Sequence, residues 1–441
     1  MITIYSENKS PRLLYTLEVI FKRCLGLDYK LITDWDKFKK IDLPRINYSE
    51  RDYKKSLRIV PHKLLFEDEI RDINPKVKDW DGLPAFFQTY KKGDCPFDLF
   101  AATFYLVSRY EEYLDFKPDQ HGRFPATESL AYKEEFLEQP IVNDWAARLV
   151  ALLEKDYPDY AFQHNDFQFI STIDVDMAFS YKHKGVWRNL GGFTRELLNL
   201  DLKKLDKRIR VLTDQEEDPF DNFRYQEKLH DSLGVEVIYF ILLGDHGKYD
   251  KNIDWDNDAF VDIIQSLAEK HEVGIHPSYY SNKVKKKVGE EIERLQSITV
   301  STIESSRQHF LKLDIRETYK VLMQNGILRD HSMGYSEVTG FRAGICSSYP
   351  FFDLVKNESR EFILYPFAVM DVALNHFMKL SPEEAIQKVQ LLMDRVKKHK
   401  GLFISVFHNE SLSDFDNWEG WRTVYEAILQ MATHEHYSVP A

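Results

Sequence analysis

The segment Phe169-Ile170-Ser171-Thr172-Ile173-Asp174-Val175-Asp176 constrains this chain more than any other. Its β-branched and aromatic residues predict a buried strand that ends in two carboxylates. Because strand side chains alternate between faces, Asp174 and Asp176 are expected on one side and Val175 on the other. In α/β folds, ligands bind where strands leave the sheet, so a site is expected here. The alternative is that one Asp caps a turn and the other is solvated.

After about residue 160, apolar strand-like runs alternate with amphipathic segments, which is typical of a parallel sheet or barrel. The later strands are predicted at 235–243, 272–276, 361–365 and 401–408, and the helices at 219–233, 258–270, 283–298, 316–324 and 381–400. Ser381, Pro382 and Glu384 form a helix-start signature. The acidic run 214–218 is expected in a long loop, and such loops often cover a site.

Residues 1–160 are predicted to form a smaller α/β domain, followed by a larger domain at 165–441. Strands are expected at 2–5 and 56–60, and helices at 15–24, 97–107 and 142–157. The segment 156–160 contains Pro158 and breaks the last of these helices, so it marks the boundary. The run Ser108-Arg109-Tyr110-Glu111-Glu112-Tyr113 is interpreted as a solvated helix end, with contact to a partner or to the second domain as the alternative.

Composition excludes several classes of protein. The chain has 441 residues, a formal charge of −12 and three cysteines, Cys24, Cys95 and Cys346, without metal or redox spacing. The negative charge argues against nucleic acid or an anionic membrane surface as the main partner. No signal sequence and no apolar run of about 18 residues is evident, so we expect a cytoplasmic protein without a transmembrane segment.

Two histidines also follow predicted strands: His276 after Val273-Gly274-Ile275, and His408 after the strand that begins at Leu402. In a parallel sheet these imidazoles would meet Asp174 and Asp176 at one edge. Carboxylate and imidazole ligands suit Zn²⁺ or a similar divalent ion, which acidifies a bound water and polarises a carbonyl. A free carboxylate could take the water's proton and a histidine could protonate the leaving group. The pattern therefore suggests metal-assisted hydrolysis.

The order of Thr172-Ile173-Asp174-Val175-Asp176, Gly274-Ile275-His276-Pro277-Ser278, Ser306-Arg307-Gln308-His309-Phe310 and a last strand ending at His408 resembles the polysaccharide deacetylase family, the NodB-homology carbohydrate esterases. The resemblance covers roughly residues 165–435. The part before it, with Ser108 to Leu114, resembles an uncharacterised domain found in bacterial proteins of polysaccharide gene clusters. The family implies a distorted (β/α) barrel that removes acetyl groups from sugars with a divalent metal.

The resemblance also implies roles for single residues. Asp174 matches the catalytic base, Arg307 the arginine that orients it, His408 the general acid and His276 a metal ligand. Asp176 would be a second ligand, because Val175 stands where the family has its second acid. Tyr280 stands where the family has its second histidine, which leaves two ligands where catalytic zinc usually has three. His309 is a candidate for the third.

Arg342 and Tyr280 are predicted to contact the substrate, an acetylated sugar or oligosaccharide, the tyrosine by stacking on a sugar ring. The sequence thus predicts a hydrolase of cell-surface polysaccharide metabolism. One alternative is a catalytically silent barrel that binds glycan or acts as a scaffold, which the replacement of a ligand by Tyr280 favours. Another is a metal-independent hydrolase of a different C–N bond.

Overall fold

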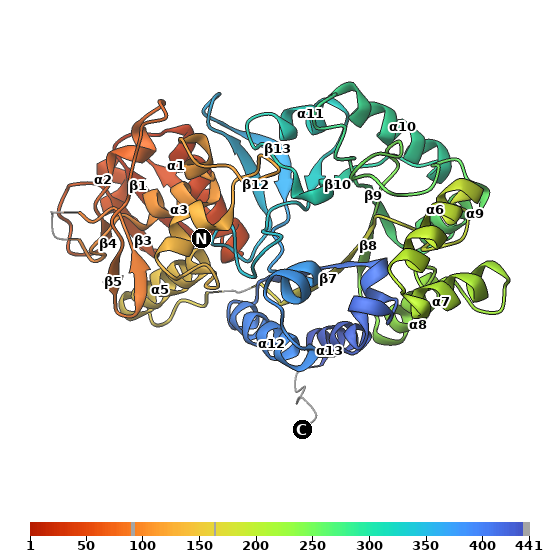
Figure 1. Cartoon of the computed structure of the whole chain (residues 1–441). Coiled ribbons are helices and arrows are strands. Elements are labelled where there is room, and N and C mark those ends of the chain that lie inside the picture. Colours follow the sequence, from red (N-terminus) through yellow and green to blue (C-terminus); the bar gives the residue numbers. More distant parts are fainter. Residues whose placement is uncertain (90–92, 163–164, 435–441) are drawn as a thin grey trace.

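The structure, a computed structural model, describes residues 1–89, 93–162 and 165–434. Its first sheet has four parallel strands in the order β2-β1-β3-β4: β1 (Ile2–Ser6), β2 (Tyr29–Ile32), β3 (Arg45–Tyr48) and β4 (Leu57–Ile59). Helices pack around it (Figure 1): α1 (Pro11–Leu17), the π-helix η1 (Glu18–Cys24), α2 (Trp35–Lys39), α3 (Leu99–Val107), α4 (Leu130–Lys133) and α5 (Ile141–Asp156). The strands and helices predicted in this part of the chain are confirmed.

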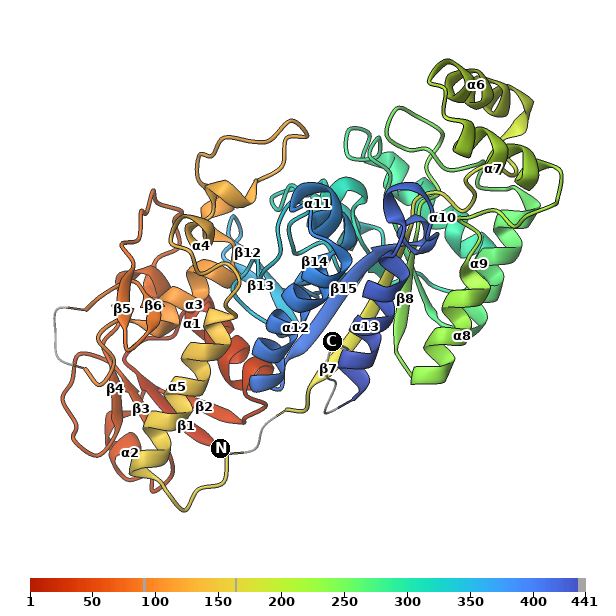
Figure 2. The same cartoon turned by 60° about the horizontal axis from the view of Figure 1, so that its bottom comes forward.

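The second sheet has nine strands in the order β12-β13-β11-β10-β9-β8-β7-β15-β14. All neighbours are parallel except β12 and β13. The sheet curls into an open half-barrel (Figures 1 and 2). Its strands are β7 (Gln168–Val175), β8 (Val237–Ile241), β9 (Glu272–Ile275), β10 (Ser305–Ser306), β11 (Arg329–Asp330), β12 (Tyr349–Asp353), β13 (Glu358–Leu364), β14 (Val369–Met370) and β15 (Leu402–His408).

The helices predicted around this sheet are confirmed: α8 (Phe223–Leu233), α9 (Asp258–Lys270), α10 (Lys286–Thr299), α11 (Thr318–Gln324) and α12 (Pro382–Lys398). A last helix, α13 (Trp421–Thr433), packs beside α12. The capping box of α12 is present, because Ser381 and Glu384 each accept a hydrogen bond from the other's backbone N–H. Among the described residues, no helix is long and apolar enough to cross a bilayer.

The long loop predicted after Asp176 is wrong over residues 185–212, which form two helices, α6 (Gly185–Leu198) and α7 (Leu202–Leu212). Gly191 and Gly192 in the middle of α6 lower its intrinsic helix propensity, and this explains why the sequence did not predict a helix here. The acidic run 214–218 follows α7. Its Asp218 accepts hydrogen bonds from the backbone N–H groups of residues 180, 181 and 182.

The interpretation of residues 108–113 as a solvated helix end is wrong. Arg109 is fully buried and pairs with Glu111 and Glu112. Its guanidinium also donates to the carbonyl of Arg342, which lies in the second part of the chain. This network joins the two parts, and one continuous hydrophobic cluster runs through both. The division into domains 1–160 and 165–441 stays a prediction, because the hydrophobic cluster is continuous across it.

Candidate metal and catalytic site

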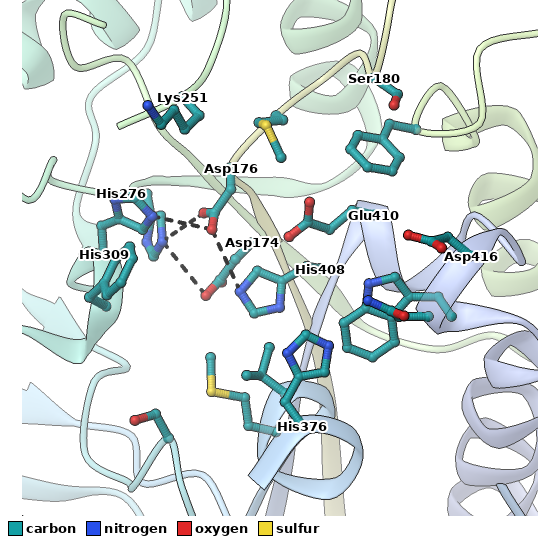
Figure 3. A pocket seen from close by; sticks show the side chains of 18 of the residues that line it. Asp174, Asp176, Ser180, Lys251, His276, His309, His376, His408, Glu410 and Asp416 are labelled. Carbon is teal, nitrogen blue, oxygen red and sulfur yellow. Dashed lines mark hydrogen bonds and ion pairs between the residues drawn. The ribbon is translucent and has the colours of Figure 1, made fainter. Parts of the chain in front are cut away.

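The four predicted site residues at strand ends meet at one edge of the nine-stranded sheet. Asp174 and Asp176 lie at the end of β7, His276 directly follows β9, and His408 ends β15. β9, β8, β7 and β15 are consecutive parallel neighbours, so their carboxyl ends lie together. These side chains line a cavity of about 1340 Å³ (Figure 3). The convergence predicted from the sequence is thereby present.

Gly274 brings β9 close to its neighbours. A Cβ at this position would lie 2.6 Å from the ring of Phe240 on β8 and 2.8 Å from the carbonyl oxygen of Ser305 on β10. Such distances exclude a larger residue without a shift of the backbone. The narrow spacing places His276 beside the segment that follows β10, which carries Arg307 and His309.

Asp176, His276 and His309 form a group that could hold a metal ion. One ligand atom from each lies within 4.8 Å of the others, and these atoms are the carboxylate oxygen and two imidazole nitrogens. Asp176 Oδ1 lies 3.2 Å from His276 Nε2, and Asp176 Oδ2 lies 3.2 Å from His309 Nε2. His309 is therefore the candidate for the third ligand in this group.

Hydrogen bonds at the far nitrogens orient both imidazoles. His276 Nδ1 lies 2.6 Å from the carbonyl oxygen of Arg307. Because a carbonyl only accepts, Nδ1 of His276 is the donor in this hydrogen bond, and Nε2 is the nitrogen that faces Asp176. His309 Nδ1 lies 2.9 Å from Asp250 Oδ1. A carboxylate or carbonyl behind each ligating imidazole is the usual arrangement at metal sites.

The charges of this group fit a bound cation. Asp176 Oδ1 is buried without a hydrogen-bond partner and lies 3.2 Å from His276 Nε2. Although burial opposes its charged form, the pKa of Asp176 is held well below its usual range by His309, His276 and His408. Burial likewise disfavours a charged His309, but Asp176 and Asp250 raise its pKa to about 9. A divalent ion bound by this group would compete with protons, because ligation needs an ionised carboxylate and an unprotonated nitrogen on each imidazole.

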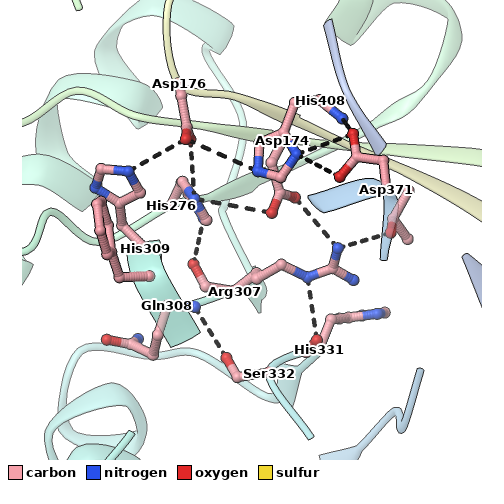
Figure 4. Close-up of polar contacts among 12 residues, drawn as sticks. Asp174, Asp176, His276, Arg307, Gln308, His309, His331, Ser332, Asp371 and His408 are labelled. Carbon is pink, nitrogen blue, oxygen red and sulfur yellow. Dashed lines mark hydrogen bonds and ion pairs between the residues drawn. The ribbon is translucent and has the colours of Figure 1, made fainter. Parts of the chain in front are cut away.

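Arg307 orients Asp174. Its Nη1 donates to Asp174 Oδ1 at 3.2 Å and to Thr172 Oγ1 at 2.7 Å, and its Nε donates to the carbonyl of His331 at 3.1 Å (Figure 4). Both Asp174 and Arg307 are buried. Asp174 Oδ2 lies 3.8 Å from His276 Nε2, so this carboxylate stands beside the metal group without belonging to it.

His408 is held by Asp371, which follows β14. Its Nδ1 lies 2.9 Å from Asp371 Oδ1, and its backbone N–H donates to Asp371 Oδ2 at 2.7 Å. The free Nε2 lies 3.8 Å from Asp176 Oδ2, on the cavity side. Burial disfavours the imidazolium, but Asp371, Asp176 and Asp174 raise the pKa of His408 well above its usual value. The contact with Asp371 therefore favours the protonated imidazole.

Two predicted substrate residues are not brought to the cavity. Arg342 is buried and makes a bidentate ion pair with Glu112, with N···O distances of 2.9 and 2.7 Å. Tyr280 is 53% exposed and its side chain does not line the cavity. Substrate contact by these two residues stays a prediction without structural support.

Sequence reasoning missed other residues of the site. Asp250, behind His309, lies in a loop without a pattern, and Asp371 carried no more signal than any acid after a short strand. Glu410 lines the cavity, and burial raises its pKa to about 7. Loop residues Asp119 to Arg123 of the first part, and residues of α6 and α7, form further walls.

Comparison with known proteins gives limited matches. Residues 2–158 match a family of unknown function (DUF7033). No curated protein matches. Among solved structures, similar chains include one described as a "putative polysaccharide deacetylase from Mycobacterium smegmatis", with 13% identity, TM-score 0.39, and coverage of 63% of this chain and 87% of that one. A 4-alpha-glucanotransferase from Thermococcus litoralis has 12% identity and TM-score 0.37, with coverage of 62% and 38%.

Proposed function

We propose that this chain is a metal-dependent hydrolase that removes an acetyl group, in particular an N-acetyl group, from a sugar. The observation that carries the proposal is the placement of three units around one cavity: the Asp176, His276 and His309 group, the Asp174–Arg307 pair and the Asp371–His408 pair. A metal group, a base and an acid are the parts that water attack on an amide requires.

Each unit has a separate task in the proposed reaction. Asp176, His276 and His309 would hold a divalent ion, and two imidazoles with one carboxylate are a common ligand set for catalytic zinc. When bound, such an ion supplies Lewis acidity towards a water and a carbonyl. Asp174, oriented by Arg307, accepts the proton of the attacking water. His408 donates its Nε2 proton to the departing amine nitrogen, so that acetate and a free amino sugar leave.

A sugar substrate is supported by the motifs that resemble polysaccharide deacetylases and by the size of the cavity. At about 1340 Å³, it exceeds the ~300–1,000 Å³ typical of small-molecule pockets, so it has room for more than one sugar ring. We propose that the reaction belongs to the metabolism of a cell-surface polysaccharide, as the resemblance to polysaccharide deacetylases implies, in a bacterial enzyme that acts in the cytoplasm.

The test combines metal analysis with an activity assay on the purified full chain. We expect near-stoichiometric zinc or a similar ion by elemental analysis. We also expect acetate release from N-acetylated amino-sugar oligomers that stops with a chelator and returns with added metal. Asp174→Asn should keep the metal, because its three ligands are intact, and lose at least about 100-fold in turnover.

Three outcomes would contradict the proposal. A chain that binds no metal and releases no acetate, even with metal added, would favour the glycan-binding or scaffold alternative. Acetate release that a chelator does not affect would favour metal-independent hydrolysis. Full activity of Asp174→Asn would remove Asp174 from the reaction.

A further inference from the structure

One wall of the catalytic cavity is lined by basic side chains. We call it the cationic wall, and it consists of Lys184 directly before α6, Arg188 and Arg195 of α6, and Lys251 in the loop after β8. Gly191 of α6 also lines the cavity. Residues 184, 188, 191 and 195 are separated by four, three and four positions, so they lie on one face of the helix. That face is the one turned towards the cavity.

Arg188 joins the two elements that carry the cationic wall. Its guanidinium donates to the backbone carbonyls of Lys251, at 2.6 Å, and of Asn252, at 3.1 Å. These bonds hold the loop after β8 beside α6. Lys251 lines the same cavity as Asp176 and His276 of the metal group (Figure 3). The cationic wall therefore borders the volume in which the acetyl group would react.

The cations of this wall have no anionic partner in the part of the chain that the structure describes. The side chains of Lys184, Arg195 and Lys251 make neither an ion pair nor a hydrogen bond there. Arg188 donates only to the two neutral carbonyls. Four basic side chains thus face one cavity without a carboxylate to neutralise them.

Two other basic residues of the cavity, both on α7, are paired. Arg208 binds Glu196 of α6 with N···O distances of 2.8 and 2.6 Å. Lys204 lies 2.6 Å from Asp416. Glu196 and Asp416 also line the cavity, and these ion pairs already use their charge. Neither acid is therefore left to neutralise the cationic wall.

Lys184 shows most clearly that the free cavity lacks an anion. Its amine is partly buried, and burial together with nearby Arg188 lowers its pKa to about 8. The charges of Asp218 and Glu410 act in the other direction without forming an ion pair. Asp218 accepts hydrogen bonds from three backbone N–H groups, and burial raises the pKa of Glu410 to about 7. A partly buried cation beside a like charge is unfavourable, and a bound anion would remove this cost.

We infer that the cationic wall binds an anionic substituent of the substrate, a phosphoryl or carboxylate group on the acetylated sugar. A neutral glycan would offer these side chains only hydroxyl groups, whereas phosphate and carboxylate accept charge-assisted hydrogen bonds from Arg and Lys. Unpaired positive charge at the cavity of a chain with formal charge −12 would also draw an anionic sugar to this place. The inference rests on the proposed function, because it names the class of sugar that the site would deacetylate.

The first test compares pairs of test sugars on the purified full chain. N-acetylglucosamine 1-phosphate is compared with the methyl glycoside of N-acetylglucosamine, and an N-acetylglucosamine–glucuronic acid disaccharide with the corresponding glucose disaccharide. We expect kcat/KM for acetate release to be about tenfold higher for at least one anionic sugar than for its neutral counterpart, mainly through a lower KM. The difference should decrease as salt increases. The preferred pair shows whether the substituent is a phosphoryl or a carboxylate group.

Variants locate the contact. Lys184→Gln and Arg195→Gln each remove one charge from the cationic wall and should raise KM for the preferred anionic sugar by about fivefold or more. Lys228→Gln is the matched control, because Lys228 is an exposed residue of α8 that does not line the cavity, and it should keep the full preference. Without a ligand, Lys184→Gln should melt at a temperature no lower than that of the unchanged chain, since it removes a like charge.

Calorimetric binding of the same sugars separates this inference from the proposed function. No acetate from any test sugar would contradict the proposed deacetylation. Anionic sugars that then still bind more tightly than neutral ones, and lose this advantage in Lys184→Gln, would support the cationic wall. Equal binding of anionic and neutral sugars would overturn the inference. A preference that both Lys184→Gln and Arg195→Gln retain in full would also overturn it, because the anion would then bind elsewhere on the chain.

Discussion

His309 supplies the imidazole that the residue at position 280 does not. In the loop after His276, the side chain of Tyr280 is exposed to solvent. The backbone N–H groups of Tyr279 and Tyr280 both donate to Asp250. Asp250 in turn holds His309. We therefore predict that His309→Ala weakens binding of Zn²⁺ by more than about 100-fold, measured by competition with a chromogenic chelator.

A second histidine at position 280 should not repair this loss. Tyr280→His in the His309→Ala background is expected to stay as weak as His309→Ala alone, because the side chain at 280 does not face the cavity. His376→Ala is the matched control, since His376 lines the cavity and stacks on Trp418 outside the metal group. Rescue by Tyr280→His would show that the loop reaches the ion in another conformation.

The pH dependence of turnover should report the charge of Asp371. His408 acts as an acid only when protonated, so the rate falls as pH rises through its pKa. Asp371 raises that pKa, so Asp371→Asn should move the alkaline limb of the kcat profile to lower pH by at least about one unit. Asp416→Asn, at another carboxylate of the cavity, should leave the limb in place. An unmoved limb in Asp371→Asn would exclude His408 as the acid.

At single positions, the sequence predicted the site residues whose place follows from strand geometry. It did not predict the roles of residues that depend on a partner far away in the chain. Asp174, Asp176, His276 and His408 were found because alternation along strands and a parallel sheet place strand ends together. Arg342 looked like a substrate contact because its partner, Glu112, is 230 residues away. Asp250 could not be found because no local pattern connects a loop carboxylate to an imidazole 59 residues later.

At the scale of elements, long periodic segments were predictable and short or interrupted ones were not. β7, β15 and α12 follow from apolar runs and a capping box. β10, β11 and β14 have two residues each, too few to show alternation. α6 has apolar residues at helical spacing, Val186, Leu190, Phe193 and Leu197, but Gly191 and Gly192 interrupt it with a low intrinsic helix propensity.

One contact between elements fixes the start of the loop that follows His276. Glu291 of α10 accepts hydrogen bonds from the backbone N–H of Ser278 at 2.8 Å and from its hydroxyl at 2.6 Å. Burial raises the pKa of Glu291 to about 7 from an ordinary 4.5. The folded chain thus retains a proton that the unfolded chain loses, and the contribution of Glu291 to stability decreases as pH rises from 4.5 to 7.

Glu291→Gln keeps the size of the side chain and removes this titration. We predict that the variant gains stability relative to the unchanged chain between pH 5 and pH 8, by about 2 kcal/mol in the free energy of unfolding. Urea unfolding at both pH values measures the difference. Equal pH dependence in the two proteins would show that the carboxyl of Glu291 is ionised in the folded state already at pH 5.

At the scale of the whole molecule, the first part of the chain helps to build the catalytic cavity. His121 and Arg123 line it, and Arg123 donates to the carbonyl of Phe310 at 2.6 Å and to Ser336 at 2.9 Å. Aromatic contacts also cross between the parts, as Tyr15 and Phe104 pack on Phe352. The two parts are therefore expected to unfold together and to depend on each other for substrate binding.

Glu112 is the strongest test of that coupling. Its carboxylate lies between Arg109 of its own part and Arg342 of the other, at 2.7 Å from each, and all three side chains are buried. Glu112→Gln leaves two buried guanidinium groups with one carboxylate, that of Glu111. Because an uncompensated buried charge is costly, we predict a loss of about 3 kcal/mol in the free energy of unfolding and a higher KM for the sugar substrate.

Glu67→Gln is the matched control, because the Glu67–Arg71 pair is partly exposed and its loss should cost no more than about 0.5 kcal/mol. Denaturant unfolding followed by both circular dichroism and tryptophan fluorescence measures stability and shows whether one transition splits into two. Separate transitions in Glu112→Gln, against a single one in the unchanged chain, would assign the coupling to this ion pair. A Glu112→Gln protein as stable as Glu67→Gln would instead place the coupling in the apolar contacts around Phe352.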